Sequence, residues 1–184
     1  MRHAIVHERG RRLTRFIAEP AEEIVSDLRD IVETLTKPEP ITSIAASPVQ
    51  SFPSASPLTD VLSYMRTHVY SQVVVQDDGL LQLLTASGIA NWLEDQAPIG
   101  LANLEEATVA DALAVEPEGS FAVLPRSATA FEALDRSWGI PVETSGRLFA
   151  LLVTHSGKRS ERAIGIVTPW DLGQSRQLRR ALPH

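Results

Sequence analysis

The sequence predicts an α/β fold of the α+β type, built from two copies of one strand-helix-strand-strand-helix unit behind an N-terminal helical extension. One observation is a repeated junction: the apolar residues 165–168 end in a threonine and lead directly into a helical segment, and residues 82–85 do the same. A second is a repeated helix entrance, since residues 52–62 align with residues 124–134 at an offset of 72 positions (125 − 53). Two landmarks repeated in the same order indicate a duplicated supersecondary unit.

In the first unit, one helix is followed by one hairpin. Apolar residues recur at helical spacing over residues 58–65, after Ser56 as the N-cap and Pro57 at the first helical position. Residues 72–85 then form two apolar runs separated by the turn Asp77-Asp78-Gly79, in which Asp-Gly supplies the positive φ of a tight hairpin.

The second unit repeats this order with a longer hairpin. Its helix falls within residues 131–138, and its two strands within residues 148–154 and 163–168. The residues between these strands, 155–161, are polar and predict a solvated hairpin tip.

Composition limits the class of protein. With 184 residues, 43% of them hydrophobic, the chain can bury a core in one domain or two small ones. It has no cysteine, which excludes disulfides, thiol nucleophiles and cysteine-based metal sites. No apolar run approaches the ~18 residues that span a membrane, and a net charge of −6 argues against duplex nucleic acid as a partner. We therefore expect a soluble protein located in the cytoplasm.

The N-terminal segment predicts a separate amphipathic helix at about residues 20–36. Its apolar stripe consists of Ile24, Leu28, Ile31, Val32 and Leu35. The predicted boundaries are residues 1–39 for this segment, 40–98 for the first repeat and 104–182 for the second repeat.

The repeated order, with Thr-x-x-Asp after the last strand, resembles the cystathionine-β-synthase (CBS) domain pair, also called a Bateman module. Residues 165–172 are similar to the family's Gly-hydrophobic-hydrophobic-Thr-x-x-Asp signature, and the resemblance covers about residues 40–182. It implies a regulatory module without catalytic residues. It also implies an adenosine-containing ligand (AMP, ADP, ATP or S-adenosylmethionine) between the repeats, a homodimer, and a separate regulated partner protein.

The junction of the second repeat predicts the ligand site at Thr168, Pro169 and Asp171. The Thr168 hydroxyl and the first free N–H groups of the following helix would face a phosphate. Asp171, one turn further on, could accept two hydrogen bonds from a ribose diol. Thr-Pro-x-Asp is also an ordinary helix start, with threonine as N-cap and an acid at N3, so a purely structural cap is the alternative.

Five further residues are predicted to complete this site. The adenine is expected to stack near strand backbone around Ser120, Phe121 and Ala122. Arg126, at a helix entrance, and His68, before the strand at residue 72, are candidates for phosphate contacts. A lone histidine near a helix end is more often a surface residue, which is the alternative for His68.

The first repeat departs from the signature. Gly88 stands at the position of Asp171, and Gln82 replaces the signature glycine. We therefore expect one competent nucleotide site, on the second repeat, and a Gly88→Ala substitution that leaves affinity nearly unchanged unless the glycine holds a positive φ.

Two other functions remain open from the sequence. A ligand-free dimerisation module is favoured if Phe121 or Trp170 plugs the cleft. A ribonuclease is the second, because Arg2 and His7 resemble the Arg-x4-6-His motif that ends HEPN domains. One arginine and one histidine on a fragment cannot assemble a composite ribonuclease site, so this is the least favoured function.

Overall fold

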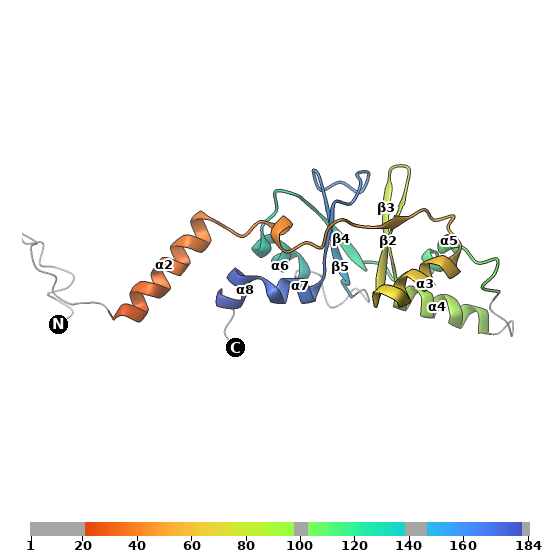
Figure 1. Ribbon diagram of the computed structural model, residues 1–184, viewed down its shortest axis with the longest axis horizontal. Helices are drawn as coiled ribbons and strands as arrows, with labels where there is room; N and C mark the ends of the chain where they lie inside the picture. Colours follow the sequence, from red (N-terminus) through yellow and green to blue (C-terminus); the bar gives the residue numbers. More distant parts are fainter. Residues whose placement is uncertain (1–20, 98–102, 139–146, 182–184) are drawn as a thin grey trace, which may run out of the picture. The chain divides into compact units, whose positions relative to one another are not determined.

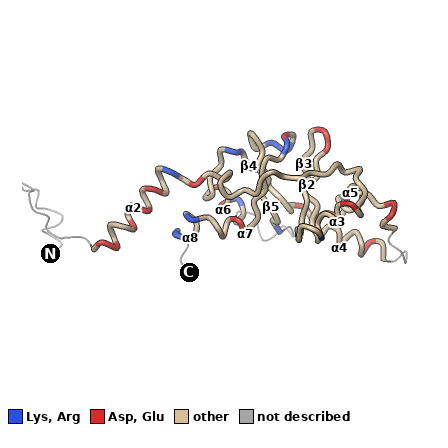
Figure 2. Tube along the Cα trace, viewed as in Figure 1, with Lys and Arg blue, Asp and Glu red and all other residues tan. Residues whose placement is uncertain are grey.

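The computed structural model describes residues 21–97, 103–138 and 147–181 (Figure 1). The chain divides into two units, Met1–Lys37 and Pro38–His184, and each is described by itself. In its described part, the first unit holds helix α2 (Glu22–Thr36), along which acidic residues predominate (Figure 2). Each side chain of the apolar stripe predicted for this helix is more than half exposed: Ile24, Leu28, Ile31, Val32 and Leu35.

The second unit contains the two predicted repeats in the predicted order. The first repeat comprises β1 (Ser51–Phe52), α3 (Leu58–His68), β2 (Gln72–Asp77), β3 (Leu80–Thr85) and α4 (Ala86–Gln96). The second comprises β4 (Phe121–Pro125), α6 (Ala130–Trp138), β5 (Ala150–Thr154), β6 (Gly165–Val167) and α7 (Pro169–Gln174). Three short helices lie outside this pattern: the 3-10 helix η1 (Ile41–Ser43), α5 (Val109–Leu113) and α8 (Arg176–Ala181). The strand-helix-strand-strand-helix unit is thus confirmed twice.

Each repeat forms its own three-stranded sheet with the same pairing. β1 pairs with β2 in parallel and β2 with β3 antiparallel; β4, β5 and β6 pair in the corresponding way. Gly79 supplies the predicted positive φ, +77°, in the β2–β3 turn. Residues of β2, β3 and β5 form a buried cluster between the two sheets, while the helices cover the outer faces (Figure 1). The repeats therefore pack sheet against sheet.

Two connecting segments each precede one repeat in the sequence and complete the core of the other. Ile41 of η1 is fully buried in the core of the second repeat, and its N–H donates to the Ala128 carbonyl at 2.8 Å. Val109 and Ala112 of α5 are fully buried in the core of the first repeat. This exchange binds the two repeats into one unit.

Two local predictions differ from the structure. Helix α3 begins at Leu58 with Pro57 as N-cap, one residue later than predicted, because the Ser56 carbonyl accepts the Val109 N–H at 2.9 Å and stays outside the helix. The segment 155–161 is also more than a solvated tip. The Arg159 carbonyl accepts the N–H of Leu81 at 2.9 Å, which attaches this segment to β3 of the first repeat.

None of the described helices is long and apolar enough to cross a membrane.

Candidate functional site

The predicted motif lies where β6 ends and α7 begins. Asp171 Oδ2 accepts hydrogen bonds from the Thr168 N–H at 2.8 Å and from the Thr168 hydroxyl at 2.7 Å. The Asp171 N–H donates in return to Thr168 Oγ1 at 3.4 Å, which completes a capping box with Pro169 in the first turn. The helix cap is therefore present. It leaves Asp171 Oδ1 available, since this atom accepts no hydrogen bond from the described residues.

Thr168 and Asp171 line a cavity of about 400 Å³, which we call the Asp171 cleft. This volume lies within the range of roughly 300–1,000 Å³ that is usual for small-molecule sites. The second repeat contributes Ile166 and Trp170 as further lining residues. The opposite wall comes from the first repeat and the segment before it: Ala46, Pro48, Val49, Gln50, Tyr64, Val69, Tyr70, Ser71, Gln72, Val73 and Val74. The cleft is thus built between the repeats, as the resemblance implies.

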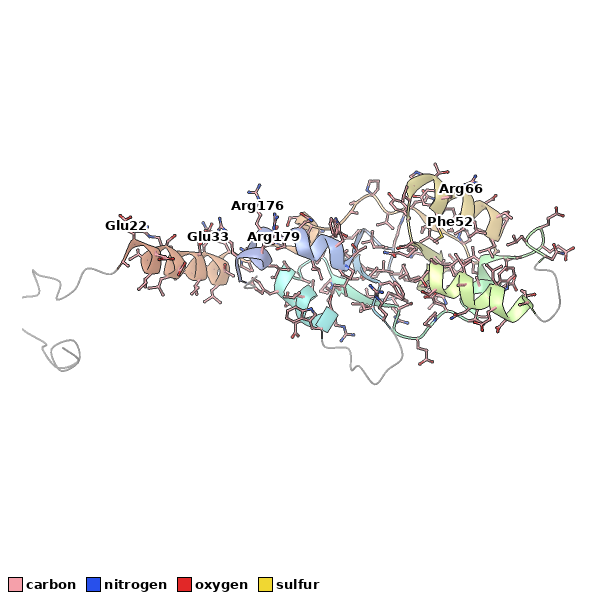
Figure 3. The ribbon with its side chains drawn as sticks, turned by 90° about the horizontal axis from the view of Figure 1, so that it is seen from below. Glu22, Glu33, Phe52, Arg66, Arg176 and Arg179 are labelled. Atoms are coloured by element: carbon pink, nitrogen blue, oxygen red, sulfur yellow. The ribbon has the colours of Figure 1, made fainter. Side chains whose placement is uncertain are left out.

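Aromatic rings form one side of the Asp171 cleft. The rings of Tyr64 and Tyr70 lie 5.9 Å apart, and Phe52 packs edge-on against Tyr64 at 5.1 Å beside α3 (Figure 3). Two effects raise the pKa of Tyr64: partial burial, which is the larger, and the neighbouring Tyr70. The Tyr64 hydroxyl is therefore a neutral donor near pH 7. Such rings offer a flat apolar surface for a heteroaromatic base.

Val69, between these tyrosines, has an unusual backbone. It ends α3 with φ +58°, in the left-handed region that a β-branched residue rarely adopts, and its side chain is 90% exposed. Residues held in such conformations cluster at ligand sites.

The other predicted site residues do not join Thr168 and Asp171. Ser120 and Phe121 line a different cavity, and Ala122 is buried in the core of the second repeat. His68 is exposed outside the Asp171 cleft, with Nδ1 2.9 Å from the Tyr64 carbonyl and its ring 4.2 Å from the Tyr64 ring. Arg126 is exposed and lines neither cleft; its N–H donates to the Thr154 carbonyl. The predicted site residues are therefore divided among two cavities, the core and the exposed surface.

The second cavity, also about 400 Å³, lies at the corresponding junction of the first repeat. We call it the Glu116 cleft. Glu116 Oε2 accepts the Thr85 N–H at 3.0 Å, and the Thr85 hydroxyl lies 2.9 Å from Oε1 and 3.1 Å from Oε2. Burial raises the pKa of Glu116, and hydrogen bonds from Thr85 and Ser120 offset only part of that rise. A carboxylate is thus present here although Gly88 carries none.

The offset between the two repeats indicates residues in the wall of the Asp171 cleft that were not among the predicted site residues. Subtracting 72 from residues 120–122 gives Pro48, Val49 and Gln50, which line the cleft beside Asp171. Because each repeat is completed by the segment that precedes the other one, the strand entrance that faces Asp171 belongs to the first repeat. The sequence contains no comparable pattern for Glu116, because the residue to which it hydrogen-bonds, Thr85, lies 31 positions away in another element.

Charge distinguishes the two clefts. The described residues that line the Asp171 cleft include no lysine, arginine or histidine. The Glu116 cleft contains Arg159, whose guanidinium lies 4.4 Å from the centre of the Phe121 ring. Within the described ranges, no group of three or more His, Asp or Glu residues could hold a metal ion. The predicted ribonuclease residues Arg2 and His7 lie outside the described residues.

Comparison with known proteins identifies the fold. Residues 41–95 match the family model of the CBS domain. The CBS domain of a bacterial CNNM/CorC family Mg²⁺ transporter in complex with ATP superposes with a TM-score of 0.55 at 18% identity, covering 86% of this chain and 98% of that one. A conserved CBS domain protein of unknown function from Thermoplasma acidophilum gives a TM-score of 0.53 at 16% identity, covering 77% of this chain and 72% of that one.

A CBS-domain-containing protein from Agrobacterium tumefaciens is similar as well, with a TM-score of 0.51 at 18% identity, covering 70% of this chain and 84% of that one. No curated protein matches the sequence. These likenesses establish a CBS fold, as the sequence predicted.

Proposed function

We propose that this chain, which carries a CBS domain at residues 41–95, is a regulatory module that binds an adenosine-containing ligand in the Asp171 cleft. The observation that carries the proposal is the geometry of Asp171: one carboxylate oxygen caps the helix, and the other accepts no hydrogen bond from the described residues within a cavity of about 400 Å³. A ribose diol supplies two donors that suit such an oxygen. The structure of an ATP-bound CBS domain with the same fold is consistent with this assignment.

The lining of the Asp171 cleft indicates which part of the ligand is recognised. Tyr64 and Tyr70 offer ring surfaces for a base, and Asp171 offers an acceptor for the sugar. No cationic side chain among the described lining residues neutralises a phosphate, so phosphates would extend toward solvent. Adenosine, AMP and ATP should therefore bind with similar affinities, and the nucleoside should supply most of the binding energy.

A ligand-free dimerisation module is the second candidate. This function is favoured if Phe121 or Trp170 blocks the cleft, and neither side chain blocks the Asp171 cleft. Trp170 is 76% exposed at that cleft, and Phe121 lines the other one. A homodimer, a regulated partner protein and a cytoplasmic location remain predictions.

Thermal unfolding with a panel of ligands tests the proposal. Adenosine, AMP, ATP and S-adenosylmethionine should each stabilise the protein, by about 2.7 kcal/mol at 100 times the dissociation constant. For a unit of this size that is a rise in Tm of roughly 5–10 °C. Inorganic tripolyphosphate is the control and should leave Tm unchanged. No stabilisation by any adenosine compound would favour the ligand-free module instead.

A further inference from the structure

The Asp171 and Glu116 clefts are related by the internal repeat but differ in the origin of their carboxylate. Thr168 receives its carboxylate from Asp171, three positions further along the same helix. Thr85 occupies the matching junction, and its carboxylate comes from Glu116, in the segment between α5 and β4 that joins the two repeats. The same threonine groups, N–H and hydroxyl, donate in both clefts.

The absence of a side chain at Gly88 makes room for Glu116. A Cβ atom built on Gly88 would lie 2.0 Å from Glu116 Oε2 and 3.0 Å from its Cδ, far inside van der Waals contact. The Glu116 carboxylate therefore lies where the side chain of an aspartate at position 88 would begin. Gly88 has no positive φ, so its role is the space that it leaves rather than its backbone freedom.

The two carboxylates also differ in what they leave available. Asp171 keeps Oδ1 without a hydrogen bond from the described residues. Both oxygens of Glu116 lie within hydrogen-bond distance of Thr85, and the Ser120 hydroxyl donates to the same carboxylate. The protein thus fills the acceptor position of this cleft with its own side chain and engages both oxygens.

We infer that Glu116 is an autoinhibitory plug: it occupies the Thr85 N–H and hydroxyl and so withholds them from a second ligand, although the cleft keeps a volume of about 400 Å³, and each chain therefore binds one adenosine-containing molecule. The plug is held without a counter-ion, because Glu116 forms no ion pair with the described residues. Its half-buried charge is therefore only partly compensated. Withdrawal of the side chain would leave the Thr85 N–H and hydroxyl without their acceptor, in a cleft that Arg159 also lines. The inference concerns the other cleft and rests on the proposed function for its choice of probe.

Calorimetric titration with ATP tests this plug through its stoichiometry. The wild-type chain should bind one ATP, and Glu116→Ala should bind a second one more weakly, because the opened cleft offers the Thr85 N–H and hydroxyl to a phosphate but no carboxylate to a ribose. Gly88→Ala should also bind two, because its methyl group displaces the Glu116 carboxylate by an independent route. Glu118→Ala is the matched control: Glu118 lines the same cleft but is exposed and does not contact Thr85, so this variant should bind one ATP.

The Asp171→Ala background separates this inference from the proposed function. If only the Asp171 site is misassigned, Glu116→Ala still adds one bound ATP, whether it is introduced into the wild type or into Asp171→Ala. Two ATP molecules in the wild type, or no gain in both folded variants, Glu116→Ala and Gly88→Ala, would overturn the plug. Should Glu116→Ala fail to fold by circular dichroism, the wild-type and Gly88→Ala stoichiometries still decide between these outcomes.

Discussion

At the scale of single residues, Val69 combines a place in the wall of the Asp171 cleft with a strained backbone. Its left-handed φ of +58° costs an L-residue about 1–2 kcal/mol, whereas glycine adopts it freely. Glycine loses about 0.5–1 kcal/mol more conformational entropy on folding. Val69→Gly should therefore raise the unfolding free energy by up to about 1 kcal/mol, while it removes an apolar side chain from the Asp171 cleft and weakens ligand binding.

Urea denaturation of the wild type, Val69→Gly and Val69→Ala measures this effect. Val69→Ala is the control because it removes most of the side chain and keeps a Cβ in the left-handed conformation. We expect only the glycine variant to be stabilised. A glycine variant less stable than the alanine variant would mean that the backbone at this position is not strained.

The sequence predicts some residues of the site and misses others for a definite reason. The contact between Thr168 and Asp171 spans three positions, so local spacing reveals it. Glu116 reaches Thr85 only through the packing of α5 against the first repeat, and no local pattern records that distance. For the same reason Gly88 looks like a lost carboxylate in the sequence, and the structure shows the space into which another carboxylate fits.

At the scale of elements, the segment 155–161 is organised by one carboxylate. Glu161 accepts hydrogen bonds from the hydroxyl and the N–H of Ser156, and these bonds lower its pKa to about 2. A depressed carboxyl pKa adds stability that is present above pH 4.5 and is lost as the pH falls toward 2. The unfolding free energy of Glu161→Gln should therefore fall less than that of the wild type as the pH is lowered from 4.5 toward 2. Above pH 5 the substitution should have little effect on the pH dependence.

Guanidinium denaturation at a series of pH values checks the role of Glu161. Ser156→Ala removes the main cause of the pKa shift, so its profile should resemble that of Glu161→Gln. A wild-type dependence that persists in both variants would assign the acid sensitivity to other carboxylates.

Long, periodic elements are the ones that the sequence predicts well. The hairpin β2–β3 follows from two apolar runs around a turn, α3 from helical spacing, and α4 from the repeated threonine junction. The helices η1 and α5 span three and five residues, too short for periodicity to indicate which core they join. Because of their exchange between repeats, the residues predicted as the adenine wall, 120–122, do not line the Asp171 cleft.

At the scale of the whole molecule, the duplication makes two similar clefts chemically different. Each cleft is lined by the last strand of one repeat and by the strand entrance of the other, so neither exists without both repeats. One cleft keeps a carboxylate oxygen available, and the other is filled by a side chain from the connection between the repeats. We propose that, because of this difference, the ligand binds in the Asp171 cleft and not in the Glu116 cleft.

The chain contains a matched control for Asp171. Asp111 forms the same capping box in α5: its Oδ2 accepts the Thr108 N–H at 2.8 Å and the Thr108 hydroxyl at 2.7 Å, and it lines neither cleft. Loss of either N3 acid should destabilise the protein by about 0.3–1 kcal/mol. Only Asp171 should affect the ligand, because two charge-assisted hydrogen bonds of ~1.5 kcal/mol each amount to about 3 kcal/mol, or on the order of a hundredfold in affinity.

Calorimetric titration of AMP into the wild type, Asp171→Ala and Asp111→Ala is the most direct test of this claim. We expect wild-type affinity for Asp111→Ala and an affinity about a hundredfold lower for Asp171→Ala. Equal affinity in all three proteins would mean that Asp171 only caps a helix and would contradict the assignment.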